Sequence, residues 1–482
     1  MSRSPLRLAV VGHTKTGKTS LFQTLLRSRD FGEVSPRLRT TRAVEAGEVV
    51  DGDGVIAVLL DTPGIERAER LRYAIESIRD DHRDDSRMLL HRFLTSPAAA
   101  DDNALGLEAK AVQAALDADV LLYVVDARSE PQQKHEDELW VLAATTRPVI
   151  PVLNYTARHD ADPNCWRSVC ADQGVHTTVE FDAVVYDDAG EQRLLRAVNA
   201  LDTVKASVPD LDEVIKRWKA LRERERQQMI LAATELVAEF LITASAAVVE
   251  TKPRKRTERE VAVEAANARF LCDLLKHEDD TRGHIAEAFG FFGKEAEAAK
   301  LDVEKALGGT DFLSRANLLQ HVKIVAAAGA GAAVGAGVGA TVDISVAGLS
   351  LGGATVLGGA AGATVAGSRM ALRWFRGQDV LELREDVVEQ LAGRAVATIR
   401  AMLARGHAAV ESVSIDATVK ESLASDADPA WRPSLRKARG QASWSDLSWP
   451  RRSGVFGYAR AETVKKVAAA LADVLTSPNA GA

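Results

Sequence analysis

Residues 12–20, near the amino end of the chain, have the types and the spacing of a phosphate-binding loop. The stretch "GHTKTGKTS" has glycines at positions 12 and 17, followed by a lysine and a threonine, and so matches G-x-x-x-x-G-K-[ST]. Glycine lets the backbone curl until several N–H groups point at one phosphate. The lysine reaches the β- and γ-phosphates, and the hydroxyl binds Mg²⁺. We therefore expect a nucleoside triphosphate to bind at Gly12, His13, Thr14, Lys15, Thr16, Gly17, Lys18, Thr19 and Ser20.

This loop needs a strand before it and a helix after it, and the sequence predicts both. "LRLAVVG" (residues 6–12) is a short apolar run typical of a buried strand. "TSLFQTLL" (residues 19–26) has apolar residues at helical spacing. A helix that begins at the loop adds its partial positive charge to the phosphate site.

A second buried strand is predicted at residues 55–64, "VIAVLLDTPG", and it ends in polar residues. Asp61 at its carboxyl end is placed to hold the Mg²⁺ shell, and Gly64 can offer its N–H to a γ-phosphate. Between the two strands lie Thr40 and Thr41. A threonine there could complete the Mg²⁺ shell and close a loop over the γ-phosphate.

These pieces, GHTKTGKT, TTR and DTPG, together with the later strand "VLLYVVDAR" (residues 120–128), resemble the Era/TrmE-type P-loop GTPases over about the first 200 residues. The resemblance implies an α/β domain with a mostly parallel sheet that has helices on both faces. It also implies that Thr41 is the switch threonine. The candidate catalytic residues are therefore Thr41 and two lysines of the loop, Lys15 and Lys18. The whole chain resembles a bacterial family in which such a GTPase precedes a C-terminal domain of unknown function.

The guanine-reading motif of these GTPases, Asn-Lys-x-Asp, is incomplete. Asn154 follows the strand at residues 148–154, but Tyr155 and Ala157 stand where the lysine and the aspartate are expected. Tyr155 could stack on a base without distinguishing guanine from adenine. Asp160 lies three positions late, and Asp182, before Ala183, lies where the last guanine-contacting loop of the family would fall. Either aspartate could replace the missing one, and the sequence does not choose between them.

Two further residues bear on hydrolysis. Ile65 follows DTPG, where many small GTPases carry a glutamine that orients the attacking water. Lys15 stands where several relatives have an asparagine beside a bound K⁺, so its ammonium could serve as a cation built into the chain. The alternative is that Lys15 points to solvent and only tunes phosphate affinity.

The chain has 482 residues, 46% of them hydrophobic, which predicts two or more folded domains. Residues 1–205 are expected to form the GTPase domain, with a helical insertion at about 66–112. Residues 206–482 are expected to form an all-α domain. A net charge of −7 argues against general nucleic-acid binding. Three cysteines provide no disulfide framework, so a reducing cytosol is the simplest compartment.

Residues 325–367 form a Gly/Ala-rich stretch whose only charge is Asp343, near its middle. Each arm is about long enough to cross a bilayer as a helix, and glycines spaced by four put small residues on one helix face. Basic residues flank the stretch at Lys323 and Arg369, which suits a hairpin with both ends on the cytosolic face of the inner membrane. The rival is a packed Ala/Gly hairpin buried in the C-terminal domain.

Together these features predict a nucleotide-dependent switch that hydrolyses GTP to GDP and phosphate with Mg²⁺, coupled to a membrane-associated helical domain. An ATPase on the same loop is one alternative, and a slow-turnover nucleotide-binding membrane scaffold is another. Expected partners are GTP, GDP and inner-membrane lipid, with a homodimer or another protein left open and no nucleic acid.

Overall fold

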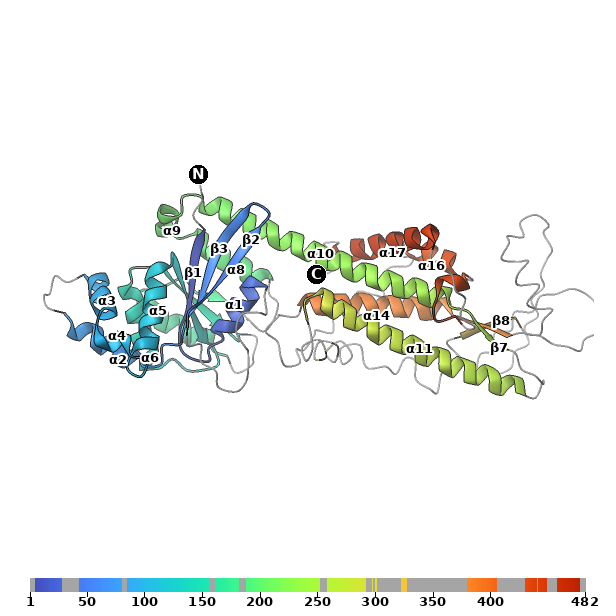
Figure 1. The fold of residues 1–482 in the computed structure, drawn as a ribbon, viewed down its shortest axis with the longest axis horizontal. Helices are drawn as coiled ribbons and strands as arrows, with labels where there is room; N and C mark the ends of the chain where they lie inside the picture. The colour runs from blue at the N-terminus through green and yellow to red at the C-terminus, as the bar shows by residue number, and fades with distance from the viewer. Residues whose placement is uncertain are drawn as a thin grey trace, which may run out of the picture. The chain divides into compact units, whose positions relative to one another are not determined.

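A computed structural model describes most of the chain. The described residues are 5–27, 43–79, 85–156, 161–181, 188–251, 258–291, 297, 300, 322–326, 379–404, 430–439, 441–448 and 457–476. The chain divides into two compact units, the first comprising Met1–Arg226 and Ala404–Val413 and the second Gln227–Leu403 and Ser414–Ala482. Figure 1 shows the helices and strands of the chain.

The first unit contains a six-stranded sheet in the order β2-β3-β1-β4-β5-β6. All neighbouring strands are parallel except β2, which pairs antiparallel with β3. The strands are β1 (Leu6–Val11), β2 (Glu45–Asp51), β3 (Gly54–Asp61), β4 (Val120–Asp126), β5 (Val149–Asn154) and β6 (Val179–Glu180). This is the mostly parallel α/β sheet that the sequence predicts.

Register brings the polar strand ends to one edge of the sheet. Val10 pairs with Asp61 across β1 and β3, and Asp126 pairs with Asn154 across β4 and β5. Because parallel strands all point the same way, the segments that follow β1, β3, β4 and β5 leave the sheet at this edge. Ligands bind at this edge in open α/β sheets.

Successive side chains of each strand point to opposite faces of the sheet, so a hydrophobic core lies on each face. Ala9, Val11 and Tyr123 belong to one core, and Leu8 and Val10 belong to the other. The first core also takes apolar residues from α2 (Ala68–Ser77), α3 (Ser86–Leu94), α5 (Gly106–Asp117), α6 (Gln133–Ala144) and α7 (Pro163–Asp172). The second takes them from α1 (Lys18–Leu26), α8 (Asp188–Asn199), α9 (Asp202–Ser207) and the start of α10 (Leu211–Ala246). Burial on both faces explains why β1, β3, β4 and β5 are almost continuously apolar.

Helices α2, α3, the short α4 (Pro97–Ala100) and most of α5 fill the segment in which the sequence predicts a helical insertion. Leu71, Ile75 and Phe93 of this segment are fully buried, whereas Tyr73 and Met88 are exposed. The insertion therefore packs on the sheet as part of the first unit.

The second unit is largely helical. One core joins the end of α10 with α11 (Arg259–Ala288), α14 (Glu385–Ala404), α16 (Arg432–Ala438) and α17 (Tyr458–Thr476). A short 3₁₀ helix lies at Ala442–Trp444. Helix α10 is continuous, with its first residues in the first unit and its later residues in the second.

The helical character predicted for this region is confirmed, and the structure adds one short sheet that the prediction of an all-α domain did not include. A three-stranded antiparallel sheet, β7-β9-β8, is formed by β7 (Val249–Thr251), β9 (Asp379–Leu383) and β8 (Val322–Ala326). Each strand is only three to five residues long and pairs with a segment far away in the sequence, so no local pattern distinguished it from its helical surroundings.

Strand β8 also corrects the start of the predicted hydrophobic hairpin, because residues 325 and 326 belong to the sheet. Residues 327–367 lie outside the described residues. Within the described part of the chain, one helix, α10, is long and apolar enough to cross a bilayer. Some 67% of its most apolar window is buried inside the protein, so packing within the fold accounts for that composition.

Candidate nucleotide-binding site

The loop between β1 and α1 has the backbone that a phosphate cradle requires. Gly12 and Gly17 have φ of 136° and 92°, in the region that favours glycine. A Cβ on Gly12 would lie 2.5 Å from the Val124 carbonyl oxygen, and one on Gly17 would lie 2.2 Å from Asn154 Nδ2. Helix α1 starts at Lys18 with no side-chain cap, so its first N–H groups remain available to an anion.

Lys18 lies across this loop and is buried. Its Nζ donates to the His13 carbonyl oxygen at 2.7 Å, and the Thr16 hydroxyl donates to the same oxygen at 3.0 Å. Burial lowers the pKa of Lys18, and the carboxylates of Asp61, Glu138 and Glu66 partly offset that effect. A phosphate anion in the cradle would stabilise the charged ammonium further.

Thr19 and Asp61 meet where the sequence predicts the metal shell. Thr19 Oγ1 donates to Asp61 Oδ2 at 2.8 Å, and Asp61 is 1% exposed. The other oxygen, Asp61 Oδ1, is buried and has no hydrogen-bond partner among the described residues. Burial raises the pKa of Asp61 to about 6. A hydroxyl beside an unsatisfied carboxylate oxygen is the hard oxygen donor set that Mg²⁺ prefers, so these residues fit the ion.

Gly64 lies against the loop, as its expected phosphate-sensing role requires. A Cβ at Gly64 would lie 2.3 Å from Thr14 Oγ1 and 2.8 Å from Thr14 N, so a larger residue could not approach so closely. The preceding Thr62 hydroxyl donates to the Val10 carbonyl oxygen at 2.8 Å and ties the segment to β1. The DTPG segment is thereby held beside the phosphate cradle.

A buried network below the loop was missed by the sequence analysis. His13 Nδ1 lies 2.9 Å from Glu138 Oε1 and 2.9 Å from the Ile65 carbonyl oxygen. Glu138 is fully buried, and its Oε2 accepts from the Tyr123 hydroxyl at 2.8 Å. Burial and the Glu138 carboxylate hold the pKa of the Tyr123 phenol well above its usual range. A signal was available in the sequence, because Glu138 opens the apolar stretch "ELWVLAA" (residues 138–144), where a carboxylate is unusual unless it has buried partners.

The predicted base-reading residues have unexpected roles. Asn154 Nδ2 donates to the Thr16 carbonyl oxygen at 3.0 Å, so this side chain braces the phosphate loop. Tyr155 has a left-handed φ of 62°, and the Arg128 guanidinium lies 4.1 Å from the centre of its ring. Arg128 is held by Asp126 through two hydrogen bonds of 2.8 and 2.7 Å. One face of Tyr155 therefore already has a cationic neighbour.

The other predicted site residues are placed as follows. Lys15 is exposed and has a left-handed φ of 69°, and Ser20 is buried in the first turn of α1. Thr41, Asp160, Asp182 and Ala183 lie outside the described residues. Among described residues no group of three or more His, Cys, Asp or Glu side chains could hold a metal ion. The Mg²⁺ assignment in the described part of the chain thus rests on Thr19 and Asp61.

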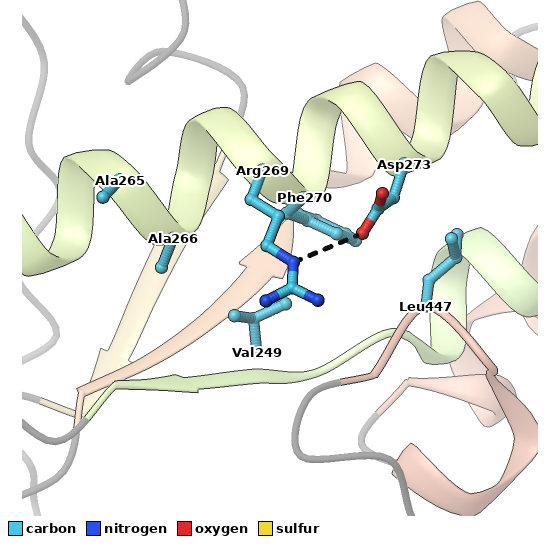
Figure 2. Close-up of a pocket in the computed structure, with 7 residues that line it drawn as sticks. All are labelled: Val249, Ala265, Ala266, Arg269, Phe270, Asp273 and Leu447. Atoms are coloured by element: carbon cyan, nitrogen blue, oxygen red, sulfur yellow. Dashed lines mark ion pairs between the residues drawn. The ribbon is translucent and has the colours of Figure 1, made fainter.

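A separate cavity of about 230 Å³ lies in the second unit (Figure 2). Its lining is mostly apolar and comes from β7, α11 and the segment after the 3₁₀ helix. Arg269 and Asp273, one turn apart on α11, form an ion pair of 3.8 Å at its side. The full lining is Val249, Ala265, Ala266, Arg269, Phe270, Asp273 and Leu447. Both charged side chains of the pair are well exposed, unlike the buried Lys18 and Asp61 of the phosphate loop.

Comparison with known proteins gives matches to both parts of the chain. Residues 7–155 match the family described as 50S ribosome-binding GTPase. Residues 167–469, well over half of the chain, match the family described as Domain of unknown function (DUF3482).

Single relatives match about a third of the chain. GTPase Der from Nautilia profundicola is 28% identical over 150 residues, which are 31% of this chain and 25% of that protein. GTPase Der from a Nitratiruptor species is 27% identical over 160 residues, or 33% of this chain and 27% of that protein. The chain thus spans about a quarter of the length of these relatives.

Among solved structures, Era in complex with MgGDPNP and nucleotides 1506–1542 of 16S ribosomal RNA is similar at 21% identity. That match has a TM-score of 0.26 and covers 38% of this chain and 52% of the other. The phosphate loop, the DTPG segment and the two family matches give one conclusion: the chain belongs to the DUF3482 family and carries a P-loop GTPase domain ahead of the domain that defines that family.

Proposed function

We propose that this chain is a switch that binds Mg²⁺–GTP, hydrolyses it to GDP and phosphate, and uses the cycle to change the state of its helical second part. One observation carries the proposal. At the carboxyl edge of the sheet, Lys18 crosses the loop, Thr19 meets Asp61, and Gly64 lies against Thr14. This is the arrangement that triphosphate hydrolysis needs, within a domain that matches a GTPase family.

Each residue has a role in this proposal. The loop N–H groups and Lys18 bind and orient the β- and γ-phosphates, and Asn154 keeps the loop in shape through Thr16. Thr19 and Asp61 would hold Mg²⁺, which supplies positive charge to the phosphates when bound. Gly64 would donate its N–H to the γ-phosphate, a contact that GDP lacks, and Thr41 would close over the same group.

Coupling to the second part would run through α10. The first turns of α10 contact α1, because buried Arg222 donates a hydrogen bond to the Leu25 carbonyl oxygen. Arg222 also donates to Glu191 of α8 at 2.8 Å. The same helix continues to Ala246, within the core of the second unit. A change at the end of α1 would therefore act on an element shared by both units.

Membrane association is the second step of the proposal. Its support is sequence alone: residues 327–367 carry one charge, Asp343, and glycines at helical spacing, and basic residues flank the stretch. An inner-membrane location on the cytosolic face follows from this, with a buried Ala/Gly hairpin as the rival. A homodimer or a protein partner is also compatible with a switch of this kind.

The nucleotide part is tested by calorimetric binding and by phosphate release for wild type and Lys18→Ala, with Lys110→Ala as a control at a lysine of α5 whose side chain is 42% exposed. Lys18→Ala should abolish binding, whereas Lys110→Ala should not change it. Equal binding by Lys18→Ala and wild type would refute the phosphate-loop assignment. Competition binding of ATP against GTP distinguishes a GTPase from the ATPase alternative. The rate of GTP hydrolysis in the presence of vesicles distinguishes a switch from a slow-turnover scaffold.

The membrane part is tested by removing residues 327–367, which leaves β8 intact. Full-length and shortened proteins are floated with vesicles of phosphatidylethanolamine and phosphatidylglycerol. We expect the full chain to float and the shortened chain to stay in solution, with its GTP hydrolysis retained. A full chain that stays in solution, monomeric and without detergent, would favour the buried hairpin.

A further inference from the structure

The residue after DTPG cannot place the attacking water. Ile65 is fully buried, and its side chain belongs to the core on one face of the sheet. Its N–H donates to the Gly12 carbonyl oxygen at 3.2 Å, and its own carbonyl oxygen lies 2.9 Å from His13 Nδ1. The side chain is therefore buried in the core, and the N–H and the carbonyl oxygen are already engaged by Gly12 and His13 of the loop, so another group must orient the water.

The chain is tied down again one residue after Glu66. The Arg67 N–H donates to Glu108 Oε1 at 3.2 Å, and Arg67 Nη1 donates to the Asn103 carbonyl oxygen at 2.7 Å. Glu108 is 1% exposed, so this anchor is within the core of the unit. With Ile65 and Arg67 both held, the position of the Glu66 backbone between them is set by the fold.

From that position the Glu66 side chain reaches the phosphate loop. Its Oε1 accepts a hydrogen bond of 2.7 Å from Thr14 Oγ1. Thr14 is the loop residue against which Gly64 packs, so the carboxylate lies beside the expected γ-phosphate sensor. The Glu66 charge also helps to raise the pKa of Lys18, as a carboxylate near that ammonium would. Unlike Ile65, Glu66 is exposed and so can meet water.

We propose that Glu66 is the catalytic residue that orients the attacking water, with Thr14 as the residue that positions its carboxylate. This rests on the GTP hydrolysis proposed above. A carboxylate only accepts hydrogen bonds, so it can hold both the Thr14 hydroxyl and one O–H of a water molecule. The water oxygen bonds to the γ-phosphorus, the bond from that phosphorus to the β–γ bridging oxygen breaks, and its electron pair stays on GDP. The water proton leaves with inorganic phosphate.

A carboxylate beside a γ-phosphate has a second, measurable consequence. Its negative charge repels the extra charge of GTP over GDP, so removing it should raise affinity for GTP relative to GDP. A residue that only supported the fold would not shift this ratio in that direction. The rate and the affinity ratio together therefore distinguish a catalytic from a structural role.

The experiment compares full-length wild type, Glu66→Ala and Glu66→Gln, with Glu69→Gln as a matched control at an exposed carboxylate three residues later. Single-turnover GTP hydrolysis and the affinities for GTP and GDP are measured for each. Glu66→Ala should slow hydrolysis by about 10²- to 10³-fold, as other removed water-positioning or charge-stabilising groups do. Glu66→Gln keeps an accepting oxygen and should retain part of the rate, and Glu69→Gln should match wild type.

Thr14 gives an independent check. Thr14→Ala should slow hydrolysis less than Glu66→Ala does, and Thr14→Ser should restore the rate because it keeps the hydroxyl. An active wild type with an equally active Glu66→Ala variant would overturn the role of Glu66 alone. A wild type that binds but never hydrolyses GTP would overturn the proposed function, and this role with it.

Discussion

Asp61→Asn should change the pH dependence of stability in the first unit. In the nucleotide-free protein Asp61 is buried, with Oδ1 unpartnered among the described residues, and its pKa rises from 3.8 to about 6. Below pH 3.8 the carboxyl is protonated in both folded and unfolded chains. Between pH 4 and 6 the folded protein keeps a proton that the unfolded chain releases, so stability falls as pH rises. Above about pH 6 the full cost of the buried charge is present.

The size of this effect follows from the two pKa values. A rise from 3.8 to about 6 corresponds to about 3 kcal/mol over the whole titration, of which about 2.4 kcal/mol is lost between pH 4 and pH 7.5, because the unfolded carboxyl is already partly ionised at pH 4. Asparagine does not ionise and still accepts from Thr19, so the variant lacks this loss. Its new Nδ2 donor takes the place of Oδ1 and costs about 1–3 kcal/mol at every pH. The prediction therefore concerns the change with pH, not the absolute stability.

Amide hydrogen exchange in the full chain provides the assay, because it reports local stability at β1 and β3 without requiring both units to unfold together. Protection of those strands, corrected for intrinsic exchange, is compared for wild type and Asp61→Asn at pH 4 and pH 7.5, without Mg²⁺ or nucleotide. From pH 4 to pH 7.5 the local stability of the variant relative to wild type should rise by about 2.4 kcal/mol. Adding Mg²⁺–GTP should protect wild type much more than the variant. If the difference in local stability between Asp61→Asn and wild type were the same at both pH values, the raised pKa of Asp61 would be refuted.

Three more predictions concern the loop, the base and α10. Lys15→Asn should slow single-turnover hydrolysis in sodium buffer by about ten- to a thousand-fold and recover part of the rate in potassium; equal rates in both salts would mean that this lysine only faces solvent. Tyr155 and Ala157 stand in place of the lysine and the aspartate of the guanine-reading motif, so the two hydrogen bonds of that aspartate to guanine are lost, at a cost of about 1–3 kcal/mol. Competition binding should therefore show a preference for GTP over ATP below about a thousand-fold. Arg222→Met should destabilise α1 by about 3 kcal/mol, at the low end for a broken buried pair because Arg27 still contacts Glu191 at 3.1 Å. Hydrogen exchange of the α1 amides measures this loss of stability. Adding Glu191→Leu removes the carboxylate that Arg222→Met leaves without this partner, so the double variant should recover most of the stability; no recovery would contradict this explanation.

Local patterns in the sequence were enough to predict the nucleotide loop. Residues 6–26 contain the strand, the glycine turn and the helix in succession, so the contacts that define them are close in the chain. Lys18, Thr19 and Asp61 were identified because their chemistry follows from position relative to predicted strand ends. The parallel sheet was also predictable, because strands buried on both faces are almost uniformly apolar.

Elements whose stability comes from distant partners were not predictable. Strand β9 at Asp379–Leu383 pairs with Val249–Thr251 and Val322–Ala326, and none of these short segments has a strong strand pattern of its own. Asn154 was expected at the base and instead binds the Thr16 carbonyl oxygen, 138 residues earlier. The order of strands brings these groups together, and a local periodicity contains no information about that order.

The catalytic environment was also decided by tertiary structure. By itself the sequence placed Ile65 where many small GTPases carry a glutamine, and isoleucine cannot orient water, so another group was expected to do so. That Glu66 reaches Thr14, and that Glu138 lies under His13, depends on contacts between residues 52 and 125 positions apart. Such contacts form only when β1, β3 and α6 pack around one sheet edge, because the fold and not the chain sets the distance between them.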